Sequence, residues 1–176
     1  MPDKPPEHLL LDRIATPIGE ALLVTDEEKN LRALDWADHE HRMRRLLRLH
    51  YGTMPLEDGA APPDVRQALQ DYFAGDVTAL QRIAWRTAGT AFQREVWAAL
   101  TRIPPGETLS YGALAARLGK PRAVRAVGTA NGANPVSVVV PCHRIIGADG
   151  SLTGYGGGLD RKRWLLAHEG ARVTTE

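Results

Sequence analysis

The sequence predicts a two-part α/β (α+β) protein, with a small N-terminal sheet-plus-helix domain at residues 1–86 and a mainly helical C-terminal domain at residues 87–176. Residues 9–36 read as strands: Leu9–Ile14 alternates weakly, Ala21–Val24 is an apolar run, and Leu31–Trp36 alternates again. From residue 90 onward, apolar side chains recur at helical spacing with short loops between segments. The pattern changes at Ala88-Gly89-Thr90, so we expect a domain boundary or hinge there.

The N-terminal domain begins with a predicted meander of strands. Its three segments are Leu9–Ile14, Ala21–Val24 and Leu31–Trp36, separated by turns at Pro17-Ile18-Gly19 and Asp26–Asn30. An arginine-dense helix is expected over His39–His50, and the Pro- and Gly-rich residues 52–63 are expected to form a loop. Asp64 is expected to cap a helix that runs to Phe73 and ends at Gly75. Alternation over Leu80–Arg86 predicts a further strand.

The helices of the C-terminal domain carry start and stop signals. The expected segments are Phe92–Thr101 capped by Thr90, Tyr111–Leu118 capped by Ser110, Arg122–Ala130 opened by Pro121, and Arg161–His168 ended by Gly170. Between the last two helices, the apolar run Val138–Val140 is expected to be a strand that Pro141 ends. Residues 147–158 form a glycine-rich loop.

Composition limits the class of protein. The chain has 176 residues, of which 43% are hydrophobic and 24% charged, which is typical of a soluble globular protein. No apolar run approaches the roughly 18 residues that a membrane span needs. The segment Met1–Glu7 has no apolar core, so we expect no signal peptide. A single cysteine without an export signal favours the reducing cytoplasm.

The net charge of +1 conceals an asymmetry between the two halves. Residues 1–86 hold 11 Lys and Arg against 15 Asp and Glu, a net of −4, whereas residues 87–176 hold 11 against 6, a net of +5. The second half is therefore the one that could meet a polyanion. An unevenly charged solvated surface explains the same counts equally well.

Cys142 is the only cysteine, so it cannot form an internal disulfide or a multi-cysteine metal site. The imidazole of His143 and the guanidinium of Arg144 follow it, and nearby cations favour the nucleophilic thiolate. The valines before it favour a packed structural thiol instead, and both interpretations remain open. Adjacent strand residues point to opposite faces. His143 can therefore act on the sulfur only if the backbone turns or a water bridges them.

The two helices around Gly119 form a helix-turn-helix pattern. Lys120, Arg122 and Arg125 could reach phosphates or enter the base stack, and Ala126 and Gly128 would let the backbone approach a narrow partner. An ordinary helical hairpin in a core has the same pattern.

Three other features are weaker signals. From the pattern alone Glu169 is a solvated helix-end charge, and Asn134-Pro135 is a turn. The glycines of residues 154–158 imply close backbone approach to a ligand, but they match no phosphate-binding fingerprint.

Taken together, the motifs of residues 89–170 resemble the methylated-DNA–protein-cysteine alkyltransferases, which repair guanine alkylated at O6. The matching segments, in the family's order and spacing, are Phe92-Gln93, Val96-Trp97, Ile103-Pro104, Gly106-Glu107-Thr108, Ser110-Tyr111-Gly112, Leu118-Gly119, Arg125-Ala126-Val127-Gly128, Asn134-Pro135, Pro141-Cys142-His143-Arg144, Gly154-Tyr155, Gly157-Gly158, Leu165-Leu166 and Glu169-Gly170. The N-terminal half resembles the family more loosely, through Thr16-Pro17-Ile18-Gly19 and Tyr72-Phe73-Ala74-Gly75. The resemblance implies a ribonuclease-H-like N-terminal domain.

The resemblance also implies roles for individual residues. Cys142 would accept the alkyl group, His143 would act as its base through a water, and Glu169 would orient the imidazole. Tyr111 would donate a hydrogen bond to the flipped guanine. Arg125 would fill the space that the flipped nucleotide leaves.

The remaining residues would hold the DNA and form the pocket. Lys120, Arg122, Ala126 and Gly128 would lie at the minor groove, and Asn134 would tie the helix pair to the active-site strand. The pocket would be lined by Tyr155, Gly156, Gly157, Gly158 and Ile145.

The resemblance implies one irreversible transfer per molecule, from O6-alkylguanine in duplex DNA, with O4-alkylthymine as a further candidate substrate. We expect a monomer without a cofactor whose DNA affinity falls with added salt. We also expect no metal, because the N-terminal half lacks the cysteine that zinc-binding relatives use, and His8, His39, His41 and His50 alone are weak ligand candidates. The alternatives are a non-catalytic lesion-binding protein and, less favoured, a cysteine hydrolase.

Overall fold

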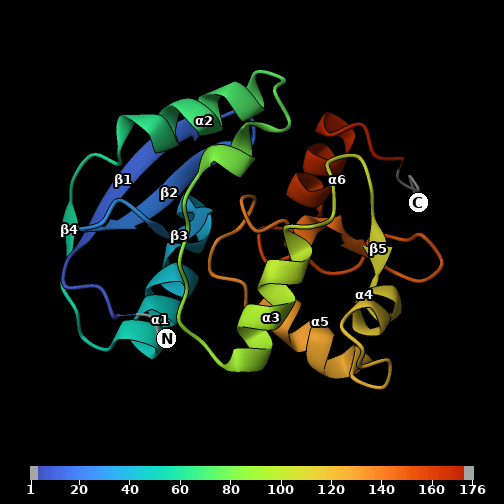
Figure 1. Cartoon of the computed structure of the whole chain (residues 1–176). Helices are drawn as coiled ribbons and strands as arrows, with labels where there is room; N and C mark the ends of the chain where they lie inside the picture. The colour runs from blue at the N-terminus through green and yellow to red at the C-terminus, as the bar shows by residue number, and fades with distance from the viewer. Residues whose placement is uncertain (1–3, 173–176) are drawn as a thin grey trace. The chain divides into compact units, whose positions relative to one another are not determined.

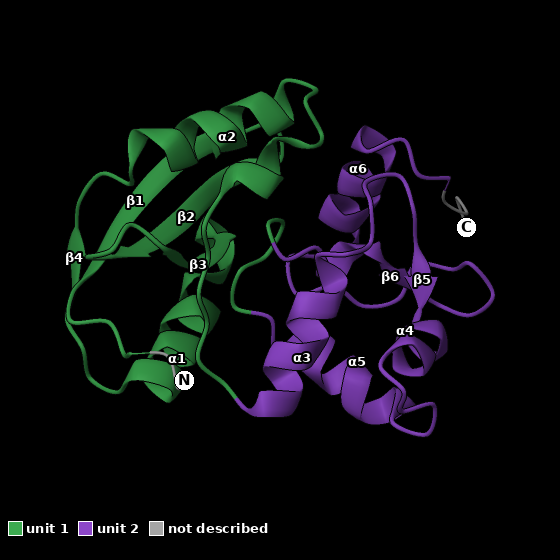
Figure 2. Ribbon diagram, in the orientation of Figure 1, with its two compact units in different colours: residues 1–89, 135–139 green, residues 90–134, 140–176 purple. Residues whose placement is uncertain are grey.

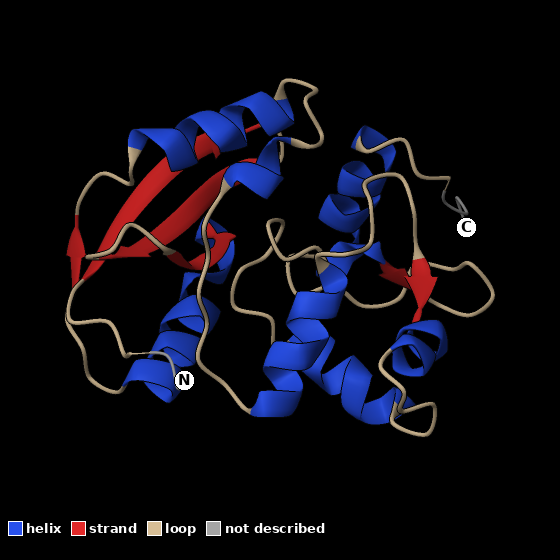
Figure 3. Ribbon diagram, in the orientation of Figure 1, coloured by secondary structure: helices blue, strands red, loops and turns tan. Residues whose placement is uncertain are grey.

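The structure, a computed structural model, describes residues 4–172. The chain forms two compact units: unit 1 contains residues 1–89 and 135–139, and unit 2 contains residues 90–134 and 140–176 (Figure 2). The first unit combines a sheet with helices and the second is mainly helical (Figure 3), which confirms the predicted mixed α/β class. The domain boundary expected between residues 86 and 87 stays a prediction. The expectation of no signal peptide falls partly on residues 1–3, outside the described residues.

Unit 1 is built on a four-stranded sheet in the order β3-β2-β1-β4. The predicted meander is confirmed: β1 (Leu9–Thr16), β2 (Gly19–Asp26) and β3 (Leu31–Trp36) pair antiparallel. The loop expected over residues 52–63 was wrong in part, because β4 (Leu56–Asp58) pairs parallel with β1. A strand of three residues is too short to produce a periodic pattern.

Helices pack against this sheet (Figure 1). The 3₁₀ helix η1 (Ala37–His39) leads into α1 (Glu40–Tyr51), whose Met43 and Leu47 join a core cluster with residues of β1, β2 and β3. Helix α2 (Pro63–Phe73) follows β4 and contacts β1. The predicted cap at Asp64 was wrong, since Pro62 occupies the N-cap position and Pro63 opens the helix with its fixed φ.

The strand expected over Leu80–Arg86 was also wrong. The 3₁₀ helix η2 (Ala79–Arg82) covers its first three residues, and only an isolated bridge joins Trp85 to Leu31. Ile83 is buried and Trp85 half-buried between exposed neighbours, which produces the apolar alternation without a ladder. None of the helices in residues 4–172 is long and apolar enough to cross a membrane.

Unit 2 confirms the predicted helices, with shifted ends. They are α3 (Ala91–Leu100), α4 (Tyr111–Arg117), α5 (Val124–Gly132) and α6 (Leu159–His168). Thr90 forms a capping box with Gln93, and the Ser110 hydroxyl accepts a hydrogen bond from the Ala113 N–H, as expected. The short strands β5 (Leu109–Ser110) and β6 (Ile145–Ile146) pair in parallel.

Two further predictions were wrong. Arg122 does not lie on the second helix of the pair, because α5 begins only at Val124, after a turn. The segment before Cys142 is not a strand: it contains Val138 at a φ of 72° and leads into the 3₁₀ helix η3 (Cys142–Arg144). The apolar run reflects burial in an irregular segment, which periodicity cannot distinguish from a buried strand.

Candidate active site

Cys142 is the first residue of the 3₁₀ helix η3 and is buried, with 7% of the residue exposed. The Cys142 N–H donates to the Val140 carbonyl at 2.8 Å, and the Arg144 N–H to the Pro141 carbonyl at 3.0 Å. The backbone therefore turns at the cysteine. This was one of the two conditions under which His143 could act on the sulfur.

His143 is completely buried and contacts Glu169, which caps the end of α6. The His143 Nε2 lies 2.8 Å from Glu169 Oε2. A carboxylate accepts hydrogen bonds, so Nε2 is the donor and the neutral ring keeps Nδ1 as its acceptor. Nδ1 is buried and has no hydrogen-bond partner among the described residues. The imidazole is thus held at one nitrogen and available as a base at the other.

Glu169 is held from its other side by Arg144. The Arg144 Nε donates to Oε1 at 2.8 Å and its Nη2 donates to Oε2 at 3.0 Å, while its Nη1 donates to the Ile103 carbonyl at 2.6 Å. This two-point pairing fixes the carboxylate plane. The Arg144 guanidinium, which the sequence offered as a cation for the thiolate, is occupied by Glu169.

Burial and charge act in opposite directions on this pair. Burial lowers the pKa of His143 and outweighs the carboxylate of Glu169, which raises it, so the imidazole is neutral. Burial alone would raise the pKa of Glu169. The contacts with His143 and Arg144 outweigh that effect and hold this pKa below its usual range. A neutral base beside an ionised, orienting carboxylate is the arrangement that activates a nucleophile.

Lys162 is a component of the site that the sequence prediction missed. It is fully buried on α6, and its ammonium donates to the carbonyls of Ile145 at 2.6 Å and Thr153 at 3.1 Å. Burial lowers the pKa of Lys162 to about 8, and Cys142 nearby raises it. A signal was available, because Lys162 lies three and four residues before Leu165 and Leu166 and shares their buried face.

Tyr111 is the first residue of α4, directly after the Ser110 cap. Its hydroxyl lies 2.8 Å from the Thr153 hydroxyl, in the glycine-rich loop. Thr153 was not predicted, because a threonine in a polar loop carries no pattern. Through its hydroxyl and its carbonyl, Thr153 connects Tyr111 with Lys162.

Two asparagines at the C-terminal end of α5, Asn131 within the helix and Asn134 just after it, contact the segment that carries the thiol. Asn134, predicted for such a role, donates from Nδ2 to the Val140 carbonyl at 2.7 Å. Asn131, which was not predicted, places its Nδ2 at 3.5 Å from the Cys142 carbonyl. The helix-turn-helix pair and the thiol are therefore joined within unit 2.

The residues predicted to line the pocket differ in exposure. Ile145 and Gly157 are buried, Tyr155 and Gly158 are half-buried, and Gly156 is exposed. The Gly158 N–H donates to the Tyr155 carbonyl at 2.9 Å, and Arg161 donates to the Gly157 carbonyl at 3.0 Å. These bonds shape the loop ahead of α6.

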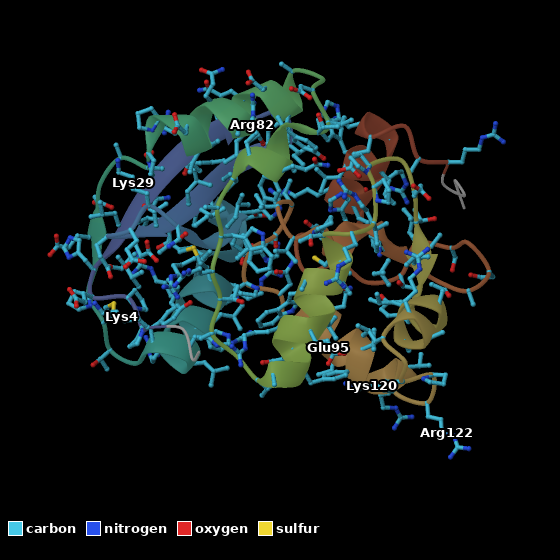
Figure 4. All side chains as sticks on the ribbon, in the orientation of Figure 1. Lys4, Lys29, Arg82, Glu95, Lys120 and Arg122 are labelled. Atoms are coloured by element: carbon cyan, nitrogen blue, oxygen red, sulfur yellow. The ribbon has the colours of Figure 1, made fainter. Side chains whose placement is uncertain are left out.

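The predicted DNA-contacting residues lie around the turn between α4 and α5. Lys120, Arg122, Arg125 and Ala126 are exposed, and Arg122 projects away from the ribbon (Figure 4). A hollow of about 480 Å³ is lined by Lys120, Pro121, Arg122 and Ala123. Gly128 is half-buried beside Tyr111, and a Cβ atom at this position would lie 3.6 Å from the Tyr111 ring. Residues 4–172 contain no group of three or more His, Cys, Asp or Glu side chains placed to hold a metal ion.

A buried thiol with an adjacent, carboxylate-held base, in the unit that carries a helix-turn-helix, defines a class: cysteine-nucleophile proteins with a DNA-binding helix pair. Sequence comparison agrees with this class. Residues 91–171 match the family described as 6-O-methylguanine DNA methyltransferase, DNA binding domain, and residues 11–84 match its ribonuclease-like domain.

Relatives match over nearly the whole chain. The Salmonella typhimurium methylated-DNA–protein-cysteine methyltransferase is 52% identical over 93% of this chain and 96% of its own, and the Mycobacterium leprae protein of that name is 46% identical over 91% and 92%. The crystal structure of Mycobacterium tuberculosis O6-methylguanine methyltransferase has a TM-score of 0.74 at 39% identity and covers 96% of both chains. A structure of the M. tuberculosis protein in complex with DNA has a TM-score of 0.72 at 39% identity and covers 90% of this chain and 92% of that one. The chain belongs to the 6-O-methylguanine DNA methyltransferase family.

Proposed function

We propose that this protein reverses alkylation damage by moving an alkyl group from guanine O6 in duplex DNA to the sulfur of Cys142. The observation that carries the proposal is the buried row of Cys142, His143 and Glu169, in which the imidazole is held at Nε2 and free to accept at Nδ1. Names and structures of relatives support the same activity.

The reaction begins with loss of the thiol proton through a bridging water to Nδ1 of His143. The sulfur then supplies the electron pair of a new bond to the alkyl carbon, and the bond between that carbon and O6 breaks. Its electron pair leaves with guanine, toward which Tyr111 donates a hydrogen bond. The product is a thioether that water does not cleave, so each molecule reacts once. Lys162 provides a buried positive charge near the sulfur.

The substrate must leave the base stack, because a duplex hides O6 from a buried thiol. We propose that α5 enters the minor groove, where its exposed Ala126 and half-buried Gly128 allow close approach, and that Arg125 fills the vacated space. One monomer acts on each lesion. A thiol that must stay reduced suits the cytoplasm.

The test is an intact-mass measurement after mixing the protein with a duplex that contains O6-methylguanine. We expect the mass to increase by one methyl group, located on Cys142 by peptide mapping, and no increase for Cys142→Ser. Repeating the experiment with ethyl, benzyl and O4-methylthymine lesions defines the substrate range. A gain that persists in Cys142→Ser would overturn the assignment of the acceptor. Lesion binding with an unmodified thiol would instead support the non-catalytic alternative.

A further inference from the structure

Lys120 lies in the turn between α4 and α5, where the proposed DNA contacts begin, but its charge is already paired. Its Nζ contacts the Glu95 carboxylate on α3 at 2.8 Å and lies 5.3 Å from the centroid of the Phe92 ring. Phe92 and Glu95 are three residues apart and share one side of α3. Helix α3 therefore presents a ring and a carboxylate together to this lysine.

The neighbouring cations are arranged differently. Arg122 and Arg125 are exposed, and neither side chain forms an ion pair or hydrogen bond within residues 4–172. Figure 4 shows Arg122 directed away from the ribbon, whereas Glu95 and Lys120 lie close together. Among the three cations at the turn and start of α5, only Lys120 has an acidic partner in this part of the chain.

We infer that Glu95 competes with DNA phosphate for Lys120, an inference that rests on the proposed DNA-binding function. In the free protein, the carboxylate occupies the place on the ammonium that a phosphate oxygen would take. In the complex, the same carboxylate lies close to the phosphate and repels it. Glu95 is thus a residue that weakens binding to DNA of any sequence and keeps the protein from being retained on undamaged duplex.

The ion pair is weak enough to open when DNA binds. The side chains of Lys120 and Glu95 are 46% and 42% exposed, and pairs of that kind are strongly screened by water. The remaining repulsion between carboxylate and phosphate predicts a roughly 3- to 10-fold loss of affinity at low salt. It also predicts that the affinity of the wild-type protein falls less steeply with salt than that of a protein without this carboxylate, by the equivalent of about one released counterion.

The experiment measures binding of an undamaged, fluorescein-labelled duplex by anisotropy, between about 50 and about 200 mM salt. Glu95→Gln keeps the size of the side chain and removes its charge. Glu107→Gln is the matched control, because Glu107 is exposed in the same unit and has no ion pair within residues 4–172. We expect Glu95→Gln to bind roughly 3- to 10-fold more tightly with a steeper salt slope, and Glu107→Gln to change affinity by less than about twofold.

The variant Lys120→Ala distinguishes a failure of this inference from a failure of the proposed DNA-binding function. We expect Lys120→Ala to bind more weakly, and the gain from Glu95→Gln to shrink when both substitutions are combined, as coupled sites require. Equal gains for Glu95→Gln and Glu107→Gln would overturn the inference, because only net charge would then matter. Unchanged DNA binding by Lys120→Ala would instead overturn the proposed docking through this turn. If Lys120→Ala still transfers the methyl group, the proposed repair activity is unaffected by that result.

Discussion

The sulfur of Cys142 depends on side chains that are far apart in the sequence. His143 follows it directly, but Lys162 lies on α6 and Glu169 follows the end of that helix. The sequence was sufficient to single out Cys142 and His143, because a lone cysteine beside an imidazole is a visible pattern. The spacing of Lys162 from Leu165 and Leu166 indicated its burial, but its contacts, like those of Thr153 and Asn131, depend on how loops meet helices, and local patterns do not encode them.

The proposed role of His143 as a base leads to a kinetic prediction. His143→Gln retains an N–H that can donate to Glu169 but has no ring nitrogen to accept the thiol proton. We expect the single-turnover transfer rate to fall by about 10²- to 10⁴-fold, the usual contribution of a general base. Quench-flow with an O6-methylguanine duplex measures it. His8→Gln, which changes a half-exposed histidine of unit 1, is the control. Equal rates for the two variants would exclude His143 as the base.

The buried Lys162 makes stability depend on pH. Its pKa is about 8 in the folded protein and about 10.4 in an unfolded chain. Between these two pH values the unfolded state binds more protons than the folded state. The free energy of unfolding therefore increases as the pH rises from about 8 to about 10.4, and this gain disappears as the pH falls back toward 8. Lys162→Met keeps an unbranched side chain without the charge. We expect the stability of wild type relative to Lys162→Met to rise by about 3 kcal/mol across this window in urea unfolding. A pH-independent difference would contradict the buried charge.

At the scale of elements, long and capped helices were predictable, and short or irregular segments were not. Thr90 and Ser110 marked the starts of α3 and α4, because a side chain that accepts from the first turn is a local feature. The strand β4 and the turn η3 have only three residues each and depend on tertiary contacts. The expected strand over Leu80–Arg86 failed because η2 occupies its start and only an isolated bridge at Trp85 follows.

The Ser110 cap bears on the proposed function because Tyr111 is the first residue of the helix it starts. Ser110→Ala removes the acceptor for the Ala113 N–H, now at 3.0 Å. We expect the free energy of unfolding to fall by about 1 kcal/mol, measured by urea denaturation. Ser110→Thr retains a capping hydroxyl and should stay within a few tenths of a kcal/mol of wild type. An equal loss in both variants would mean that packing of the serine, and not its hydroxyl, supports α4.

At the scale of the whole molecule, the chain returns to unit 1 just before Cys142. Residues 135–139 belong to unit 1, where the Leu34 N–H donates to the Pro135 carbonyl at 3.0 Å and the Ser137 N–H donates to the Leu34 carbonyl at 3.1 Å. Cys142 follows this segment within a few residues. The change from strand-like to helical periodicity near residue 88, and the change in charge between the two halves, were visible in the sequence. The return of residues 135–139 to unit 1 was not, because a single bridge between Leu34 and Val136 leaves no periodicity.

This crossing predicts that the basic C-terminal half alone will react slowly. A fragment of residues 87–176 lacks Leu34 and both of its backbone hydrogen bonds, each worth about 1 kcal/mol in ordering the segment before Cys142. We expect its transfer rate to fall by roughly 10- to 30-fold, while its DNA affinity retains the salt dependence of the intact chain.

The matched control is the full chain cleaved after Gly89, in which both pieces remain together and unit 1 still supplies Leu34. A fragment as fast as the intact protein would show that unit 1 does not order the cysteine segment. A cleaved chain as slow as the fragment would show that continuity of the backbone at residue 89, and not the contact with Leu34, sets the rate.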